Sequence, residues 1–526
     1  MTPATIPLLV GLTGSFIAVL VASLEPKYIV AFACLLPLLA VAMATRTSAR
    51  LEGLLVACLA LTIPINLSLN FLFRPHIGGA PSISIGTNML CVLALAALWL
   101  YRYRTGEVRP LFVREPSIVW ASIIYMAVGI LSLWSAPHPE LVFLEEVRLA
   151  MLLVTMLVVM NFRHEELLRT FVFFLTVATC MQGALATAQY LSHSPLGMQM
   201  FGAEDKLVKL YIGVTETRAT GTIGHPNVLG YYLESALPLP LALLLVERRP
   251  VLRFWYRVAF VATLAGLLVT LSRGAWLSVP VSCGFTLWVL YRKKVFRLGS
   301  GVGLSLMGVV LIAFLYFALP TIERRFFRDD YASASMRMPL NYAALSIVSQ
   351  YPVLGVGLNN FGEVFQDYDT TSYSKLFTEK IATAYSVSSR PYKHVVHNLL
   401  LWVWVEVGTV GLVSFLWIFL AAFLVAWRVY RGADDWSRAV LVGCVAGMLG
   451  HLTHAQLDPG FRISPSVSML FYSMFGLIGA EWLHQRRPVP PAKRSDRLRP
   501  DTGQAPAVRF GPTGDVPGAP AQHRRT

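Results

Sequence analysis

The sequence predicts an all-α polytopic membrane protein with about 12–14 transmembrane helices and a long periplasmic loop that contains amphipathic helices. Two properties of the whole chain point to this class. The 526 residues are 55% hydrophobic and only 14% charged, whereas a soluble chain carries roughly a quarter charged residues. The mean hydropathy is +0.58. The apolar residues also gather in runs of about 15–23, which is the length of a helix that crosses a bilayer.

We expect about 14 spans. The sixth and ninth are short and the twelfth is long enough to project out of the membrane, so a count of 12 stays open. The expected spans cover residues 6–23, 28–44, 52–69, 84–101, 117–134, 148–161, 169–190, 226–246, 257–271, 274–290, 299–319, 396–427, 438–456 and 464–482.

Every second loop between the expected spans is basic. Because Lys and Arg are retained on the cytoplasmic side, this alternation places both termini in the cytoplasm. It also accounts for the net charge of +15 without a nucleic-acid partner. The basic loop residues are Arg46, Arg50, Arg102, Arg104, Arg109, Arg114, Arg248, Arg249, Arg253, Arg292, Lys293, Lys294, Arg297, Arg428 and Arg431.

Three regions follow from this pattern. Residues 1–190 form N-terminal transmembrane helices, and residues 191–482 form a core that includes a periplasmic loop at about 320–395. Residues 483–526 are rich in Pro, Gly and Arg with few bulky apolar residues, a composition typical of a disordered tail. We expect this cytoplasmic tail to contact anionic lipid at most.

Two outer segments, at about 191–225 and 320–395, carry basic residues against the topological trend. An anionic ligand on the outer face explains them. The first segment ends in a turn that contains Arg218, Gly221 and Gly224 and leads directly into a span. A helix N-terminus after such a turn offers free N–H donors to an anion, and Arg218 adds a fork suited to phosphate oxygens. The alternative is an ordinary start of a helix with Asn227 near the cap.

Arg273 stands between two apolar runs of about 15 residues each. An arginine in that position is unfavourable unless it is paired or binds a ligand. Because we expect it at the outer membrane boundary, extension of its side chain into water is an equal alternative.

In the long outer segment, Leu340, Ala344, Ile347 and Val348 recur at helical spacing, which predicts an amphipathic helix lying on the bundle. Gly355 and Gly357 then mark a turn. Packing explains the apolar stripe, but it does not explain Arg337.

His397 and Asn398 precede the long twelfth span, with Glu406 inside it. A histidine at the aqueous mouth of a span is able to accept a proton from a hydroxyl, and a capping His-Asn pair is the alternative. For Glu406, as for Glu234 in the eighth span, we favour structural pairing, for Glu406 with an arginine such as Arg273.

Together and in this order, these pieces resemble the superfamily of O-antigen ligases and Wzy-type O-antigen and exopolysaccharide polymerases. The resemblance covers roughly residues 215–427. It is carried by Arg218 with Gly221-Thr-Ile-Gly-His-Pro-Asn227, by Ser272-Arg-Gly-Ala-Trp276, by Arg337 with Pro352-Val-Leu-Gly-Val-Gly357, and by His397-Asn398 with Glu406-Val-Gly408 and Gly411.

The resemblance implies a metal-independent membrane glycosyltransferase without a cofactor. Its partners would be an undecaprenyl-diphosphate-linked oligosaccharide, an acceptor that is a glycan or lipid A core, membrane lipid and a chain-length regulator. It implies that His397 is catalytic and that Arg218, Arg273 and Arg337 bind the diphosphate, supported by His225, Asn227, Asn398 and Glu406. The family's loop aromatic, which often follows a few residues after the loop arginine, appears here as Tyr342.

Fixed guanidinium groups stabilise the charge that develops on a leaving diphosphate without Mg²⁺. The acidic pair Asp367 and Asp369 is the one metal-binding candidate in the outer segments. Polymerisation of repeat units is the favoured activity, with transfer to lipid A core or to protein hydroxyls as alternatives. A lipid-linked glycan transporter is the alternative of another class, although transporters usually show two related halves and none is evident here.

Overall fold

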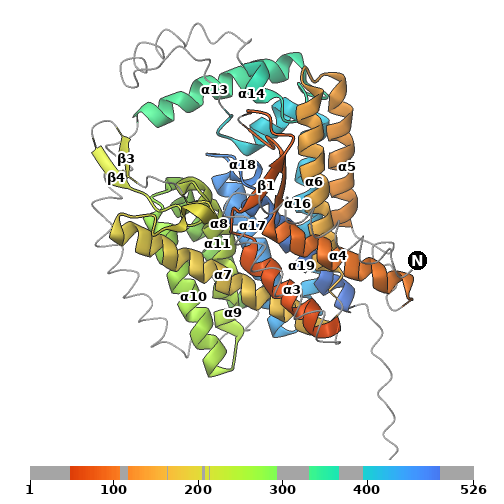
Figure 1. Cartoon of the computed structure of the whole chain (residues 1–526), viewed down its shortest axis with the longest axis vertical. Coiled ribbons are helices and arrows are strands. Elements are labelled where there is room, and N and C mark those ends of the chain that lie inside the picture. The colour runs from red at the N-terminus through yellow and green to blue at the C-terminus, as the bar shows by residue number, and fades with distance from the viewer. Residues whose placement is uncertain are drawn as a thin grey trace, which may run out of the picture. The chain divides into compact units, whose positions relative to one another are not determined.

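The structure, a computed structural model, describes residues 48–76, 78–106, 117–162, 164–203, 208–211, 214–292, 331–365 and 395–485. The side chains of residues 48–50, 208–211, 214–216 and 331–339 are outside that description. So are the expected spans at 6–23, 28–44 and 299–319, Asp367 and Asp369, and almost all of the tail. The described part is a bundle of helices with two short β-hairpins (Figure 1).

The first described helices, α3 and α4, pack side by side. The guanidinium of Arg102 is buried between them and donates a 2.6 Å hydrogen bond to Glu52. The sequence analysis placed Arg102 in a basic loop, and that assignment is wrong: the residue lies in the last turn of α4, where it pairs with a buried carboxylate. The elements are α3 (Ser48–Thr62), β1 (Ser68–Phe71), β2 (Ile83–Gly86) and α4 (Thr87–Arg104).

Four further helices each pack along a partner helix. Helix α5 packs on α16, α6 on α19, and α7 on α10. Between α7 and α10 the backbones touch, because a Cβ atom on Gly183 would lie 2.2 Å from the carbonyl oxygen of Ala262. Such small residues allow close helix contacts inside membranes. The helices are α5 (Ser117–Leu131), α6 (Pro139–Met160), α7 (Glu165–Ser192) and α10 (Pro250–Val269).

The expected span at 226–246 is present as two successive helices, α8 (Pro226–Ala236) and α9 (Pro238–Val246). Pro238 has no N–H to donate, so the chain stops one helix and starts another there. Helix α11 (Arg273–Arg292) lies beside both. The hairpin of β3 (Val208–Tyr211) and β4 (Val214–Thr217) precedes α8.

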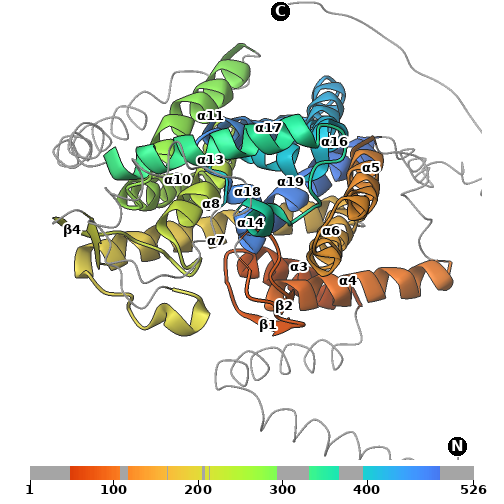
Figure 2. The same cartoon turned by 90° about the horizontal axis from the view of Figure 1, so that it is seen from above.

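Helix α13 (Tyr331–Gln350) lies across one end of the bundle (Figure 2). Its residues Leu340, Ala344, Ile347 and Val348 are buried, and the helix packs on α16. The predicted amphipathic helix is therefore confirmed. The remaining helices are α14 (Phe361–Val364), α16 (Leu399–Tyr430), α17 (Asp435–His454), α18 (Gly460–Ile463) and α19 (Pro465–Gln485).

Seven helical segments of the described part are long and apolar enough to cross a membrane. Helices α3, α4, α6 and α17 occupy four further expected spans. The prediction of an all-α polytopic membrane protein is therefore confirmed. The seven segments are Ser117–Trp134, Glu165–Ser192, Pro226–Val246, Pro250–Val269, Arg273–Arg292, Leu399–Tyr430 and Pro465–Gln485.

Candidate functional site

The site begins with the Gly-rich turn before α8, which two glutamines of α7 hold in place. Gln189 Oε1 accepts from the backbone N–H of Gly221 (2.9 Å), and Gln182 Oε1 accepts from that of Thr222 (3.1 Å). Gly221 and Gly224 have φ of +56° and +92°, which glycine adopts without strain. The N–H groups of Gly221 and Thr222 in the turn are therefore already paired. The sequence analysis expected free N–H donors at the start of the helix that follows, and that expectation stays a prediction.

Arg218 enters this turn with its side chain buried. Its Nε donates to the carbonyl oxygen of Thr270 (2.9 Å), and one terminal nitrogen donates to Oδ1 of Asn227 (2.6 Å). Thr270 belongs to the turn that joins α10 to α11, and half-buried Arg273 is the first residue of α11. The side chain of Arg218 therefore contacts the backbone of the turn that leads into Arg273.

The start of α8 is capped by His225, not by Asn227. The backbone N–H of Asn227 donates to Nδ1 of His225 at 3.2 Å. The Asn227 side chain is thereby available to face outward from the helix end. Its Oδ1 accepts from Arg218, and its Nδ2 donates to Oδ2 of Asp458 at 3.1 Å.

Asp458 also reaches the predicted catalytic histidine. Its Oδ1 lies 3.4 Å from Nδ1 of His397, whose side chain is 32% exposed while that of Asp458 is 8% exposed. Asn398 caps α16 by accepting from the backbone N–H of Leu401 (3.0 Å), and the N–H of Leu399 donates to the carbonyl oxygen of Ala455 (2.8 Å). These bonds hold the start of α16 beside the end of α17.

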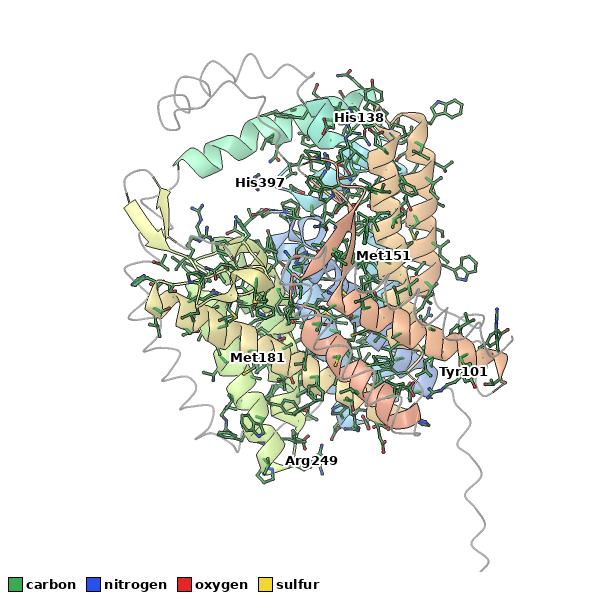
Figure 3. The ribbon with its side chains drawn as sticks, in the orientation of Figure 1. Tyr101, His138, Met151, Met181, Arg249 and His397 are labelled. Atoms are coloured by element: carbon green, nitrogen blue, oxygen red, sulfur yellow. The ribbon has the colours of Figure 1, made fainter. Side chains whose placement is uncertain are left out.

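The structure thus joins Arg218, Asn227, Asp458 and His397 into one chain of contacts, which we call the polar cluster. The end of the bundle at which α8, α11 and α16 begin and α17 ends is called the site end below. Figure 3 labels His397 near this end and Arg249 at the opposite end.

The sequence analysis missed Asp458 and Arg462. Both are buried, and both lie in the short connection between α17 and α19. The sequence did offer a signal for them, namely a carboxylate and a guanidinium in a short connection between two apolar helices. Such charges are rare at membrane depth unless they are paired.

Glu406 belongs to a second polar group, which is buried. Its carboxylate accepts from the backbone N–H groups of Asn359 (2.8 Å) and Phe361 (3.2 Å) and from Nε1 of Trp402 (2.7 Å). It also pairs with Arg462. The arginine partner of Glu406 is therefore Arg462. The pairing with Arg273, which the sequence analysis gave as an example, is wrong.

Arg462 is shared between two carboxylates. Besides Glu406, it contacts Oε1 of Glu145 at 3.3 Å, and its guanidinium lies 4.6 Å above the ring of Trp402. Burial opposes the charge of Arg462, but the two carboxylates outweigh burial and raise its pKa above the ordinary value.

Gly355 and Gly408 each lie against the backbone of the other's segment. Helix α16 is broken at Gly408, with φ of +66°, and a Cβ atom there would lie 2.1 Å from the carbonyl oxygen of Val353. In return, a Cβ atom on Gly355 would lie 2.4 Å from the carbonyl oxygen of Val405. The N–H of Val356 donates to that oxygen (3.0 Å) and the N–H of Thr409 to Pro352 (2.8 Å).

Arg337 lies in α13, and its side chain is among those outside the description. Its predicted role therefore stays a prediction. Tyr342, the aromatic that follows it, is 49% exposed.

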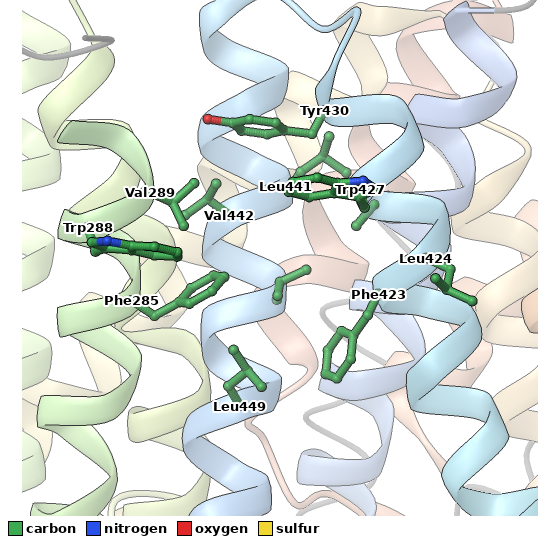
Figure 4. A pocket seen from close by; sticks show the side chains of 12 residues that line it. Phe285, Trp288, Val289, Phe423, Leu424, Trp427, Tyr430, Leu441, Val442 and Leu449 are labelled. Atoms are coloured by element: carbon green, nitrogen blue, oxygen red, sulfur yellow. The ribbon is translucent and has the colours of Figure 1, made fainter. Parts of the chain in front are cut away.

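Among the described residues, no group of three or more His, Cys, Asp or Glu side chains is placed to hold a metal ion. A pocket of about 350 Å³ lies between α11, α16 and α17 (Figure 4). Phe285, Trp288, Phe423 and Trp427 contribute to its wall, which is almost wholly apolar. It lies toward the ends of α11 and α16 that are remote from the polar cluster and offers no charged group for a diphosphate.

The helices and the polar cluster define a multi-pass helical membrane protein with a buried, charged site at one end of its bundle. Residues 258–416 match the family model described as O-antigen ligase. This match supports the predicted O-antigen ligase and Wzy-type superfamily, and with it an enzyme of ligase or polymerase type. The segment contains Arg273, Arg337, His397, Asn398 and Glu406. A search of curated proteins found no match.

Proposed function

We propose that the protein transfers a glycan from undecaprenyl diphosphate to an acceptor hydroxyl at the periplasmic face of the bacterial inner membrane. The observation that carries this proposal is the polar cluster, which links Arg218 to His397 through Asn227 and Asp458. The acceptor favoured here is another lipid-linked repeat, so the product is a surface polysaccharide such as O-antigen or exopolysaccharide. Transfer to lipid A core is the alternative.

The lipid-exposed residues support a site at headgroup depth. On α11, Leu277, Val281 and Trp288 are exposed, so the apolar outer surface of this helix begins one turn, or about 5 Å, after Arg273. A diphosphate attached to a lipid lies at that depth. The N-terminus of α11 adds the positive end of a 20-residue helix, which favours an anion.

The charge of the opposite helix ends supports the orientation. Arg248 and Arg249 follow α9, Arg292 ends α11, and Arg428 and Arg431 lie at the end of α16. These ends are the ones remote from the polar cluster. Since basic loops stay in the cytoplasm, the site end faces the periplasm, and both termini are cytoplasmic.

The proposed reaction is one displacement at the anomeric carbon. A nitrogen of His397 takes the proton of the acceptor hydroxyl, the hydroxyl oxygen forms a bond to the anomeric carbon, and the bond to the diphosphate oxygen breaks. The bonding pair leaves with undecaprenyl diphosphate, and configuration inverts. Arg218 and Arg273 stabilise the developing charge with no metal. Asp458 orients the imidazole and stabilises it after protonation.

Reconstitution of the full chain with undecaprenyl-diphosphate-linked repeats tests the proposal. Extension to longer lipid-linked glycan indicates a polymerase. Transfer only when lipid A core is added indicates a ligase. The variant His397→Ala should abolish either product at normal expression, whereas Arg248→Ala, which changes an exposed arginine at the remote end, should not. Undiminished product from His397→Ala would exclude the proposed proton transfer.

A further inference from the structure

A third polar group, also buried, lies close to the polar cluster and takes no part in the proposed reaction. Its centre is Glu234 of α8, which is fully buried. Glu234 Oε2 lies 2.8 Å from Nδ1 of His454 in α17 and accepts a 2.7 Å hydrogen bond from Oγ of Ser278 in α11. One carboxylate oxygen therefore joins three helices.

Each of these three helices carries a residue of the proposed site at its near end. Helix α8 has Asn227 two turns before Glu234. Helix α11 has Arg273 less than two turns before Ser278. Helix α17 is followed by Asp458, one turn after His454.

His454 connects the group to two of those ends. A Cβ atom on Gly274, the neighbour of Arg273, would lie 2.1 Å from Nε2 of His454, so the imidazole packs directly against the first turn of α11. The carbonyl oxygen of His454 accepts from the N–H groups of Leu457 (2.8 Å) and Asp458 (3.3 Å). The ring of Tyr231 stacks on the imidazole at 3.9 Å and fixes its plane.

We propose that Glu234 is a positioning residue: through His454 and Ser278 it sets where Asn227, Arg273 and Asp458 stand relative to one another. This proposal rests on the proposed function. A carboxylate buried inside a membrane is costly unless it is paired. Here Oε2 of Glu234 is paired with both His454 and Ser278. Displacement of a reacting group by about 1 Å costs up to about 100-fold in rate, so loosening the three helix ends should slow transfer more than it weakens lipid binding.

The first test compares two substitutions of Glu234 in the reconstituted full chain. Glu234→Gln keeps one oxygen, which can accept from both His454 and Ser278, so kcat should stay within about threefold of wild type. Glu234→Ala removes both bonds, and kcat should fall at least about tenfold, with KM for the lipid-linked glycan changed much less. A large loss in Glu234→Gln would overturn the proposal, because it would mean that the negative charge, not the position, matters.

Changes of His454 keep the test decisive if Glu234→Ala does not fold. His454→Asn retains a side-chain N–H near the position of Nδ1 and should keep kcat near wild type, whereas His454→Ala should lower it as Glu234→Ala does. The control is Glu481→Gln, which changes a buried carboxylate near the end of α19 that is remote from the polar cluster. It should leave kcat unchanged.

Two results would overturn the proposal while leaving the proposed function intact. One is a His454→Ala protein with a lowered Tm but unchanged kcat per folded molecule, which would make the group purely structural. The other is an equal loss of kcat in Glu481→Gln. An inactive wild type, or a fully active His397→Ala, would instead refute the proposed function itself.

Discussion

Asn227 donates a 3.1 Å hydrogen bond to Asp458 across 231 positions of the chain. This contact joins the first turn of α8 to the connection that follows α17, and so joins the arginine side of the polar cluster to the histidine side. Because Asn227 also accepts from Arg218, a single amide connects the predicted diphosphate-binding arginine to the carboxylate beside His397.

The carboxylate of Asp458 should be required for the proton step. In Asp458→Asn an amide replaces the carboxylate that lies 3.4 Å from Nδ1 of His397 and orients its imidazole, so we expect kcat to fall by about 10²- to 10⁴-fold. Transfer rates with the reconstituted protein measure this. Asp435→Asn, at the remote end of α17, is the matched control and should retain full activity.

The guanidinium of Arg218 should not be replaceable by the ammonium group of lysine. Its Nε and terminal nitrogen hold two acceptors at once, Thr270 and Asn227. An ammonium group has no such fixed geometry, so Arg218→Lys should lose at least about tenfold in transfer while the net charge is conserved. Activity equal to wild type in Arg218→Lys would show that charge alone is sufficient there.

Arg462 should be a stability residue. Arg462→Met leaves the buried carboxylates of Glu406 and Glu145 without their shared cation, and breaking such a buried pair costs about 3–5 kcal/mol. We expect little folded protein in detergent and a clearly lowered Tm. Arg248→Met, on an exposed side chain, provides the comparison, and an unchanged Tm in both variants would contradict the assignment.

Gly408 should tolerate no side chain. A residue with Cβ meets the carbonyl of Val353 at 2.1 Å and is strained at φ of +66°, so Gly408→Ala should destabilise the protein by at least about 1–3 kcal/mol. Gly284 in α11 has open space around it, and Gly284→Ala should be neutral or slightly stabilising. Thermal unfolding of the two variants side by side makes the comparison.

Most of the fold was predictable, because an apolar run of about 20 residues has few alternatives to crossing the bilayer. The apolar stripe of α13 was predictable for a related reason, since a period of 3.6 residues fixes which face is buried. The break in α16 was not predicted: it depends on the backbone of Val353 lying against Gly408, a contact that no local pattern specifies.

The candidate site likewise contains residues that the sequence predicted and residues that it did not. Arg218, Arg273 and His397 stand out locally, because each is a polar residue at the edge of an apolar run. Asp458 does not, since its importance comes from meeting Asn227 and His397 in space. The predicted partner of Glu406 was wrong for the same reason. The pairing of Glu406 with Arg462 depends on how α16 and α18 pack. Sequence order gives no preference for Arg462 over Arg273.

The central claim is that guanidinium groups at the site end hold a lipid diphosphate. Binding of undecaprenyl diphosphate and undecaprenyl phosphate to the purified full-length protein tests it most directly. Wild type should bind the diphosphate at least about tenfold more tightly, which is about 1.4 kcal/mol, and the Arg218→Ala, Arg273→Ala double variant should lose that preference while Arg248→Ala retains it. A double variant that still distinguishes the two lipids as wild type does would contradict the claim.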